Sequence, residues 1–285
     1  MAMVAARASR AGVRQRVINT SPSMAQLRKR GFDDCLHLQN PVSRISMSIA
    51  RGSKRPLQRN SAQDCPPCIV LLAHGASGWN ERLDTLSRLL KEAAPSISVV
   101  PLIYPYASDL KRRPPPKAEL LCQFHLEKVQ EVAIVHPNSR IIMAGHSMGG
   151  RVSVMVASMP NLPSQVCGVI CFSYPLVGIN RSVRLKPLED VGEGCVPVFL
   201  IQGNQDSFFP KSAANLVPAF VKVFVVDGGD HGLCLRQKKL QALFGCSQDE
   251  CDRALITPAL KMILQEIRPP LSIKISKRLR SCAGR

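Results

Sequence analysis

Long apolar runs are missing from this 285-residue sequence, and their absence excludes a first class of protein. Hydrophobic residues make up 45% of the chain, yet no uninterrupted run approaches the ~18 residues that a membrane-spanning helix needs. We therefore expect no membrane span and a chain that uses its apolar residues in a core. The length suits one sizeable α/β domain with tails, or two small domains.

Phosphate-binding glycine loops and a disulfide framework are also missing. Neither a Walker loop nor G-x-G-x-x-G precedes a predicted helix, so nothing indicates nucleotide binding. The eleven cysteines are odd in number and irregularly spaced, which predicts free thiols in a reducing, intracellular compartment. Cys65-Pro66-Pro67-Cys68 has the C-x-x-C spacing but lacks a second ligand pair. We expect no metal and no other cofactor.

Acidic residues are scarce at both ends of the chain. Residues 1–60 hold 12 Lys+Arg and 2 Asp+Glu, and residues 268–285 hold 6 basic residues and no acid. Residues 61–267 are almost balanced, with 20 basic and 18 acidic residues. The net charge of +18 therefore belongs mainly to the ends. We predict an α/β domain at 61–267 between two basic tails, at 1–60 and 268–285.

The basic tails fit an acidic partner, and they fit equally well a solvated segment that binds nothing. Specific nucleic-acid binding is disfavoured because the central region is almost neutral. The arginine-rich, acid-poor start is compatible with a mitochondrial transit peptide, and Arg28-Lys29-Arg30 is compatible with nuclear import. Cytoplasmic, nuclear and mitochondrial locations all stay open. Residues 42–49 could add an edge strand.

From Cys65 onward, apolar runs alternate with segments of helical periodicity. Such alternation predicts a mostly parallel sheet flanked by helices, with chemistry at the carboxyl ends of the strands. The predicted strands cover residues 68–73, 97–103, 141–144, 166–172, 196–201 and 221–226. The predicted helices cover residues 81–94, 117–136, 152–159, 211–217, 235–244 and 252–267.

One stretch, Arg140 to Gly150, organises the rest of the chain. Its apolar start predicts a buried strand, and Gly145-His146-Ser147-Met148-Gly149 follows at once. This is the G-x-S-x-G pattern, in which a serine occupies a sharp strand-to-helix turn and glycines let the two elements pass closely. The pentapeptide alone is weak evidence, but its flanks predict a nucleophilic Ser147. An ordinary turn with a buried serine is the alternative.

A serine nucleophile needs a base and an acid that orients the base. In proteins with this turn the chain order is serine, acid, histidine. His231 is the one histidine after Ser147, so we predict that it is the base. Asp206 follows a buried strand by a short turn and is the predicted acid, although it could also cap a helix. Asp230, beside the histidine, is the second choice.

The turns after the first and third predicted strands also predict further site residues. An oxyanion needs backbone N–H donors, and we assign these to Met148, which follows the nucleophile, and to Ala76, with Ser77 as an alternative. Trp79 and Phe208 are expected near the same edge of the sheet. They could line an acyl pocket, and core packing explains them equally well.

With these residues in view, the chain resembles the α/β-hydrolase superfamily over roughly Cys65 to Ile267. The motifs HGASG, GHSMGG, QGNQD and GGDH occur in the order that this superfamily shows. Together with VCGVICFSYPL, they are most similar to a small hydrolase-like group related to dienelactone hydrolases. That group includes testis-expressed hydrolase-like proteins and a subunit of the nonspecific lethal complex. The resemblance implies a compact fold with a minimal lid. The fold's first two antiparallel strands are not evident in the sequence.

Two functional hypotheses follow. The first is a serine hydrolase with the triad Ser147, Asp206 and His231, acting on a small ester, thioester or related acyl substrate. The second is a non-catalytic interaction module in a larger, chromatin-linked complex, because some members of the group that the chain resembles serve as scaffolds. The intact triad favours the first hypothesis, and the basic tails keep the second one open.

Overall fold

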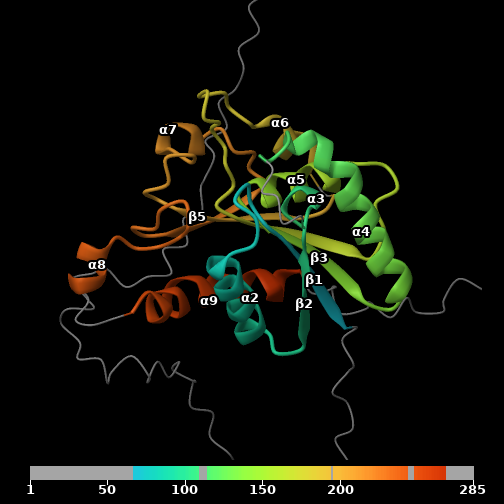
Figure 1. Cartoon of the computed structure of the whole chain (residues 1–285), viewed down its shortest axis with the longest axis horizontal. Coiled ribbons are helices and arrows are strands. Elements are labelled where there is room, and N and C mark those ends of the chain that lie inside the picture. The colour runs from blue at the N-terminus through green and yellow to red at the C-terminus, as the bar shows by residue number, and fades with distance from the viewer. Residues whose placement is uncertain (1–66, 109–113, 194, 243–246, 268–285) are drawn as a thin grey trace, which may run out of the picture.

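A six-stranded sheet forms the centre of the computed structural model, which describes residues 67–108, 114–193, 195–242 and 247–267. Every pairing in this sheet is parallel, and the strand order is β2-β1-β3-β4-β5-β6 (Figure 1). The strands are β1 (Cys68–Ala73), β2 (Ile97–Leu102), β3 (Arg140–His146), β4 (Val166–Phe172), β5 (Val198–Gly203) and β6 (Lys222–Val226).

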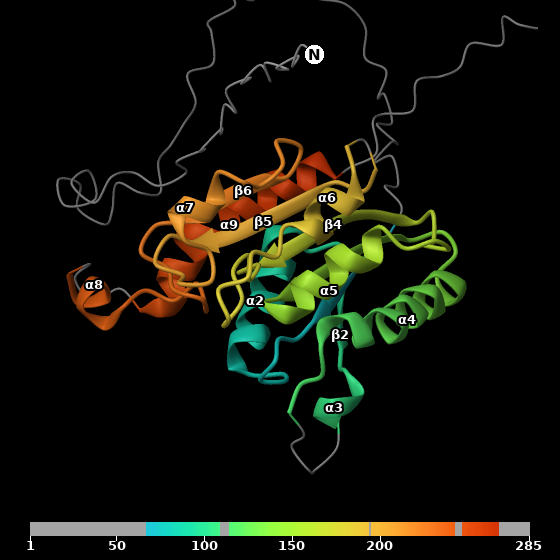
Figure 2. The same ribbon diagram turned by 90° about the horizontal axis from the view of Figure 1, so that it is seen from above.

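Helices cover both faces of the sheet (Figure 2). Helices α2 and α9 pack together on one face, while α4, α5 and α6 lie on the other (Figure 1). The helical segments are α2 (Glu81–Ala93), α3 (Pro105–Ser108), the 3-10 turn η2 (Ala118–Leu121), α4 (Cys122–Val135), α5 (Met148–Ala157), α6 (Lys186–Val191), α7 (Lys211–Ala214), α8 (Gln237–Ala242) and α9 (Gln248–Glu266).

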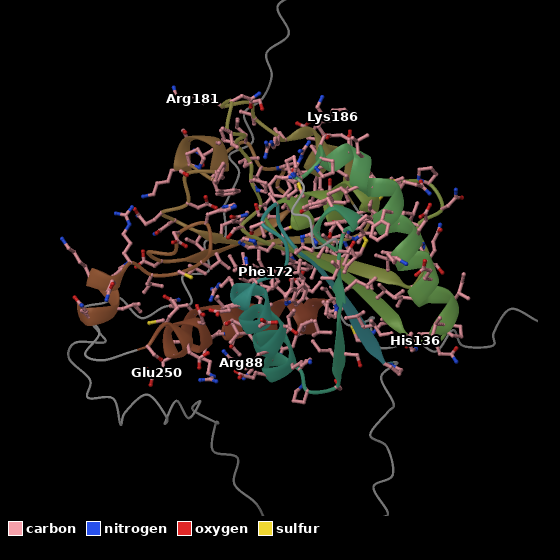
Figure 3. All side chains as sticks on the ribbon, in the orientation of Figure 1. Arg88, His136, Phe172, Arg181, Lys186 and Glu250 are labelled. Atoms are coloured by element: carbon pink, nitrogen blue, oxygen red, sulfur yellow. The ribbon has the colours of Figure 1, made fainter. Side chains whose placement is uncertain are left out.

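The apolar runs of the sequence become the buried strands. All six residues of β1 are buried: Val70 and Leu72 face the α2/α9 side, and Leu71 and Ala73 face the α4/α5 side. A strand covered on both faces needs apolar residues throughout, because neither face meets water. Phe172 of β4, labelled in Figure 3, is fully buried in the core between the sheet and helices α2 and α9. Burying one such side chain stabilises the fold by roughly 1.5–3 kcal/mol.

The strand predictions are confirmed within two residues, but several helix boundaries differ from the predictions. Helix α9 begins at Gln248, four residues before its predicted start, and α8 begins at Gln237, two residues after its predicted start. Helix α5 begins at Met148, four residues before the predicted start, because the chain turns into the helix directly after Ser147. The helix predicted for 117–136 is divided into the 3-10 turn η2 and the helix α4. The helix predicted for 211–217 ends at Ala214.

Not every apolar residue of this divided segment is buried. Leu120 of η2 and Val135 at the end of α4 are 73% and 68% exposed. The predicted tails lie outside the described residues. The candidate strand at 42–49 and the question of the fold's first two antiparallel strands lie there too. The division of the chain into a domain and two tails therefore stays a prediction.

The strand order explains where a site can form. The chain leaves β1 through α2 to reach β2 at the sheet edge, and then returns through α4 to β3 on the other side of β1. The connections of β1 and β3 therefore leave the sheet on opposite faces, which opens a crevice between the carboxyl ends of these strands. The turns that begin at His74 and Gly145 both lie at this switch point.

Candidate active site

Ser147 lies at the carboxyl end of β3, directly before α5. Its backbone angles are φ 53° and ψ −118°, a conformation that residues with a Cβ rarely adopt. Its N–H donates to the Phe172 carbonyl at 2.8 Å, which extends the pairing of β3 with β4. Arg151 N–H donates to the Ser147 carbonyl at 3.1 Å, so the serine is held by the strand on one side and by the helix on the other.

Glycines on both sides of Ser147 make this turn sterically possible. A Cβ on Gly145 would lie 2.4 Å from backbone atoms of Gly149 and Gly150, and a Cβ on Gly149 would lie 2.5 Å from the His74 carbonyl oxygen. No side chain fits at these distances. The glycines of the motif are therefore needed for the close passage of β1, β3 and α5 that leaves Ser147 at the edge of the sheet.

His231 and Asp206 come together with Ser147 from distant loops. The His231 Nε2 lies 2.8 Å from the Ser147 Oγ, and the His231 Nδ1 lies 2.8 Å from the Asp206 Oδ2. Asp206 follows β5, and its side chain is fully buried, whereas the His231 side chain is 28% exposed. The other carboxylate oxygen of Asp206 accepts the Phe208 N–H at 2.8 Å.

These contacts determine where the imidazole proton lies. An ionised carboxylate can only accept hydrogen bonds, so the Nδ1 of His231 carries the proton and donates to Asp206. The Nε2 of a neutral His231 is then an acceptor, and it faces the Ser147 hydroxyl. In this tautomer the imidazole can accept the serine proton as the hydroxyl attacks, and the carboxylate then stabilises the imidazolium.

Asp230, the second choice for the acid, is engaged in its own turn. Its Oδ1 accepts the N–H groups of Gly232 and Cys234 at 2.7 and 3.0 Å. These bonds shape the loop that carries His231, while the ring nitrogen of His231 is bonded to Asp206. The two acids that the sequence left as alternatives thus have different hydrogen-bond partners in the structure.

The backbone of the His231 loop is held by residues that the sequence analysis did not single out. The His146 Nε2 lies 2.9 Å from the His231 carbonyl oxygen and donates to it. On the α2 side, Arg82 forms an ion pair with Asp252 of α9 and also donates to the Leu233 carbonyl at 3.4 Å. Arg82 and Asp252 are 170 residues apart in the chain, so no local pattern could have predicted their pairing.

Burial keeps His146 neutral. Loss of solvent around its ring lowers the pKa of His146 to about 4, and the neighbouring His231 and Arg82 lower it further, against the opposing effect of its bond to the His231 carbonyl. A neutral His146 adds no positive charge beside the contact between Ser147 and His231.

The turn after β1 lies directly beside the nucleophile. A Cβ on Gly75 would be 3.3 Å from the Ser147 Cβ. The next residues, Ala76 and Ser77, are exposed at the tip of the turn. Met148 is the first residue of α5, so its N–H belongs to the helix N-terminus and has no carbonyl one turn earlier to bond within the helix. The two predicted oxyanion donors thus come from turns that touch each other.

The two aromatic residues predicted near the site have different surroundings. Phe208 packs on the His231 ring, with 4.6 Å between ring centroids, so it does lie at the predicted edge. Trp79 donates its indole N–H to Asp84 at 2.8 Å, and its ring packs against the core on the α2/α9 side.

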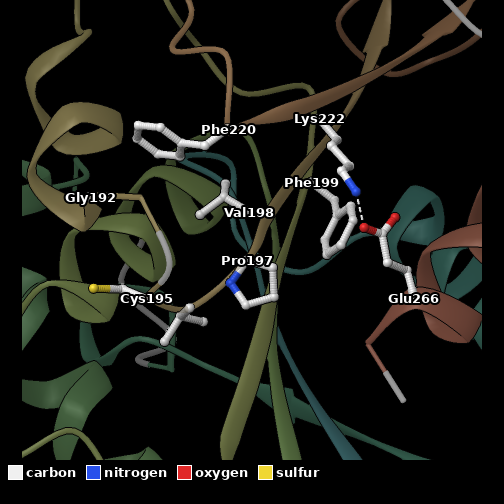
Figure 4. Close-up of a pocket in the computed structure, with 9 residues that line it drawn as sticks. Gly192, Cys195, Pro197, Val198, Phe199, Phe220, Lys222 and Glu266 are labelled. Carbon is white, nitrogen blue, oxygen red and sulfur yellow. Dashed lines mark hydrogen bonds and ion pairs between the residues drawn. The ribbon is translucent and has the colours of Figure 1, made fainter. Parts of the chain in front are cut away.

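Two other hollows lie away from Ser147. The one in Figure 4 has a volume of about 180 Å³ and lies at the amino ends of β5 and β6, the opposite edge of the sheet, with a Lys222–Glu266 ion pair at its rim. The other, of about 430 Å³, lies between η2, α5 and α6.

Among the described residues, no group of three or more potential ligands could hold a metal ion. No helix in that part of the chain could cross a membrane.

Solved structures share this architecture at low sequence identity. A serine hydrolase from Xanthomonas campestris, described as having no lid, is 15% identical with a TM-score of 0.51, and the alignment covers 72% of this chain and 84% of that one. Est1E from Butyrivibrio proteoclasticus, solved with bound ferulic acid, is 17% identical with a TM-score of 0.52 and coverages of 70% and 88%. These likenesses establish the fold. Among curated proteins, no sequence relative matches significantly.

The sequence itself also matches a family model. The model for the alpha/beta hydrolase domain matches residues 66–254, which include both turns at the switch point and all three side chains of the hydrogen-bonded Ser-His-Asp set. The expectation drawn from the motifs is thereby confirmed at the level of the superfamily. The chain belongs to the alpha/beta hydrolase domain family.

Proposed function

We propose that this protein is a serine hydrolase that acts on a small ester, thioester or related acyl substrate. The observation that carries the proposal is the unbroken series of contacts from the Ser147 Oγ to His231 and on to Asp206, each at 2.8 Å. A strained serine at a strand-to-helix turn that contacts a histidine, itself bonded to a buried acid, is the arrangement that serine hydrolases use.

In the proposed reaction, Ser147 attacks the acyl carbon while His231 takes the hydroxyl proton. The negative charge that develops on the acyl oxygen is stabilised by the N–H groups of Met148 and Ala76. His231 then gives the proton to the leaving group. In the second half of the reaction His231 takes a proton from water, the resulting hydroxide attacks the acyl carbon, and the proton returns to the Ser147 Oγ as the acid product leaves. Asp206 keeps the imidazole in the productive tautomer throughout.

The substrate class is limited by what surrounds the triad. Phe208, which packs on His231, is the proposed apolar contact for the acyl or leaving group. Trp79 is the second candidate. Est1E was solved with ferulic acid, and this agrees with a carboxylic ester as the first substrate to try. We also keep the similarity to the small hydrolase-like group as part of this proposal, on the strength of the run at 166–176.

Labelling with a fluorophosphonate probe tests the proposal, because such probes react with activated serines. The wild-type chain should be labelled, and Ser147→Ala and His231→Ala should not. Ser173→Ala is the matched control. Ser173 directly follows β4 and has a similar φ of 56°, but its buried Oγ has no hydrogen-bond partner among the described residues. If folded wild-type protein is not labelled, the alternative of a non-catalytic interaction module takes the place of the enzyme.

A further inference from the structure

The carbonyl oxygen of Gly75 accepts more hydrogen bonds than the one bond that closes its turn. Three donors converge on its oxygen: the His74 Nδ1 at 2.8 Å, the Tyr106 hydroxyl at 2.8 Å and the Gly78 N–H at 3.1 Å. A carbonyl oxygen has two lone pairs, so three donors are more than it needs to be satisfied. We call this arrangement the Gly75 carbonyl clamp.

The chemistry of His74 leaves one possible tautomer. Tyr104 N–H donates to the His74 Nε2 at 3.0 Å, and an N–H can only donate, so this nitrogen is unprotonated. The proton of a neutral ring is therefore on Nδ1, which faces the Gly75 oxygen. The His74 side chain is fully buried, and loss of solvent lowers its pKa. In this tautomer the His74 Nδ1 can only donate; the Gly75 oxygen lies 2.8 Å from it, and the Tyr106 hydroxyl oxygen lies farther away at 3.4 Å.

Tyr106 contributes the part of the clamp that is distant in sequence. It lies in α3, after β2, and its hydroxyl reaches across to the turn that follows β1. Burial raises the pKa of Tyr106 to about 12, so the phenol keeps its proton. Its ring is stacked nearly parallel to that of Tyr104, with 6.1 Å between centroids, and it meets the His74 ring edge-on.

Holding this oxygen also orients the next amide. In a trans peptide unit the C=O and N–H groups point in opposite directions, so a clamped Gly75 carbonyl directs the Ala76 N–H away from His74 and Tyr106. A Cβ on Gly75 would lie 3.3 Å from the Ser147 Cβ, so the oriented peptide unit lies directly beside the nucleophile. An amide whose orientation is set before the reaction costs no reorganisation when the negative charge develops.

We propose that Tyr106 is a positioning residue of the active site: its hydroxyl, together with the His74 Nδ1, fixes the Gly75–Ala76 peptide unit so that the Ala76 N–H is aimed at the oxyanion. This inference rests on the proposed hydrolase function and adds a residue to it. Tyr106 touches neither the substrate nor the reacting atoms, and it acts through one peptide unit.

The test compares Tyr106→Phe with Tyr104→Phe in the full-length chain. Both changes remove one buried tyrosine hydroxyl from the same aromatic cluster, but the Tyr104 hydroxyl bonds to His125 of α4 at 2.9 Å rather than to the turn. Turnover is measured with p-nitrophenyl acetate. Binding is measured with a trifluoromethyl ketone, which Ser147 would attack to give a tetrahedral adduct that carries an oxyanion. The melting temperature of each variant is measured alongside.

Losing an oxyanion donor altogether costs ~10²–10³ in kcat. Because two of the three clamp donors remain, we expect Tyr106→Phe to lower kcat by about 10-fold, equivalent to ~1.4 kcal/mol. The affinity for the trifluoromethyl ketone should fall by a similar factor, and KM should stay within about 2-fold. Tyr104→Phe should change neither quantity by more than about 2-fold.

A second pair of variants keeps the test independent of Tyr106. His74→Asn places an amide N–H near the position of the imidazole Nδ1, whereas His74→Leu has no donor, and both lose the bond from Tyr104 N–H. His74→Asn should therefore retain at least about 10-fold more kcat than His74→Leu.

Three outcomes would overturn the inference. In the first, Tyr106→Phe leaves kcat and ketone affinity unchanged. In the second, Tyr104→Phe lowers both as much as Tyr106→Phe does, which would indicate a general packing effect. In the third, His74→Asn is no better than His74→Leu. An inactive wild type is a different result, because it removes the proposed function first and this inference with it.

Discussion

Replacing Asp206 with asparagine separates the chemistry of the acid from its packing. The two side chains have almost the same shape, and the asparagine oxygen can still accept the Phe208 N–H that Asp206 Oδ1 accepts at 2.8 Å. The amide NH₂ group would then face the His231 Nδ1, which the carboxylate now binds. Two donors cannot share that contact, so the proton of His231 must move to Nε2.

The consequence is a base in the wrong tautomer. A protonated Nε2 donates toward the Ser147 Oγ and cannot accept its proton, although the heavy-atom distance of 2.8 Å need not change. Loss of the oriented carboxylate in such a triad lowers kcat by ~10⁴. We expect a loss of ~10³–10⁴ for Asp206→Asn near pH 7, with the free energy of unfolding changed by less than about 1–2 kcal/mol, because the shape and one hydrogen bond are retained.

Asp230→Asn is the matched control, because Asp230 is the acid next to His231 in the sequence. An asparagine oxygen can accept from Gly232 N–H and Cys234 N–H just as the Asp230 Oδ1 does, so kcat should stay within about 3-fold. The assay is p-nitrophenyl acetate turnover together with the rate of fluorophosphonate labelling. If Asp206→Asn keeps more than a tenth of the activity, or Asp230→Asn loses as much, the assignment of Asp206 is wrong.

Three further predictions concern the fold that supports the site. Gly149→Ala should abolish labelling and lower the free energy of unfolding by at least about 2 kcal/mol, because the new Cβ would lie 2.5 Å from the His74 carbonyl oxygen. Denaturant titration measures this free energy, and a variant as stable as the wild type would contradict the prediction. Asp252→Asn breaks the buried ion pair with Arg82 (side chains 2% and 14% exposed) and should lower the free energy of unfolding by about 3 kcal/mol. Asp190→Asn breaks an exposed pair with Lys186 and should lower it by less than about 1 kcal/mol. Equal losses for the two variants would refute the stabilising role of the buried pair. Burial holds the pKa of His125 at about 3 and that of His146 at about 4, below the unfolded value of 6.5, so these histidines stabilise the fold fully above that value and less as the pH falls through it. Each should then contribute a slope approaching about 1.4 kcal/mol per pH unit. His125→Asn should flatten the unfolding free energy measured between pH 6 and 5, and an unchanged slope would contradict the burial of a neutral His125.

Much of this architecture could be predicted from local sequence, because strands buried on both faces must be continuously apolar. The runs at 68–73 and 166–172 match β1 and β4 residue for residue. Helix boundaries were less predictable. The start of α5 at Met148 and the break between η2 and α4 depend on how the chain packs against β1 and the layer of helices, which periodicity alone does not report.

The candidate triad was predictable for a different reason. Only one histidine follows Ser147 in the sequence, and the acid had to end a strand on the same edge of the sheet. Between Asp206 and Asp230, however, the sequence left a choice. The direction of each carboxylate resolves it: one reaches the His231 ring, and the other accepts the N–H groups of its own loop.

By itself, then, the sequence determined the strand-turn-helix at Ser147, the parallel sheet, and the order of serine, acid and histidine, since these depend on neighbouring residues and on chain order. The tertiary structure alone decided what holds those groups in place. Arg82 meets Asp252 and Tyr106 meets the Gly75 carbonyl because the strand order brings the ends of distant connections to one crevice. Such contacts join residues far apart in the chain, and no local pattern encodes them.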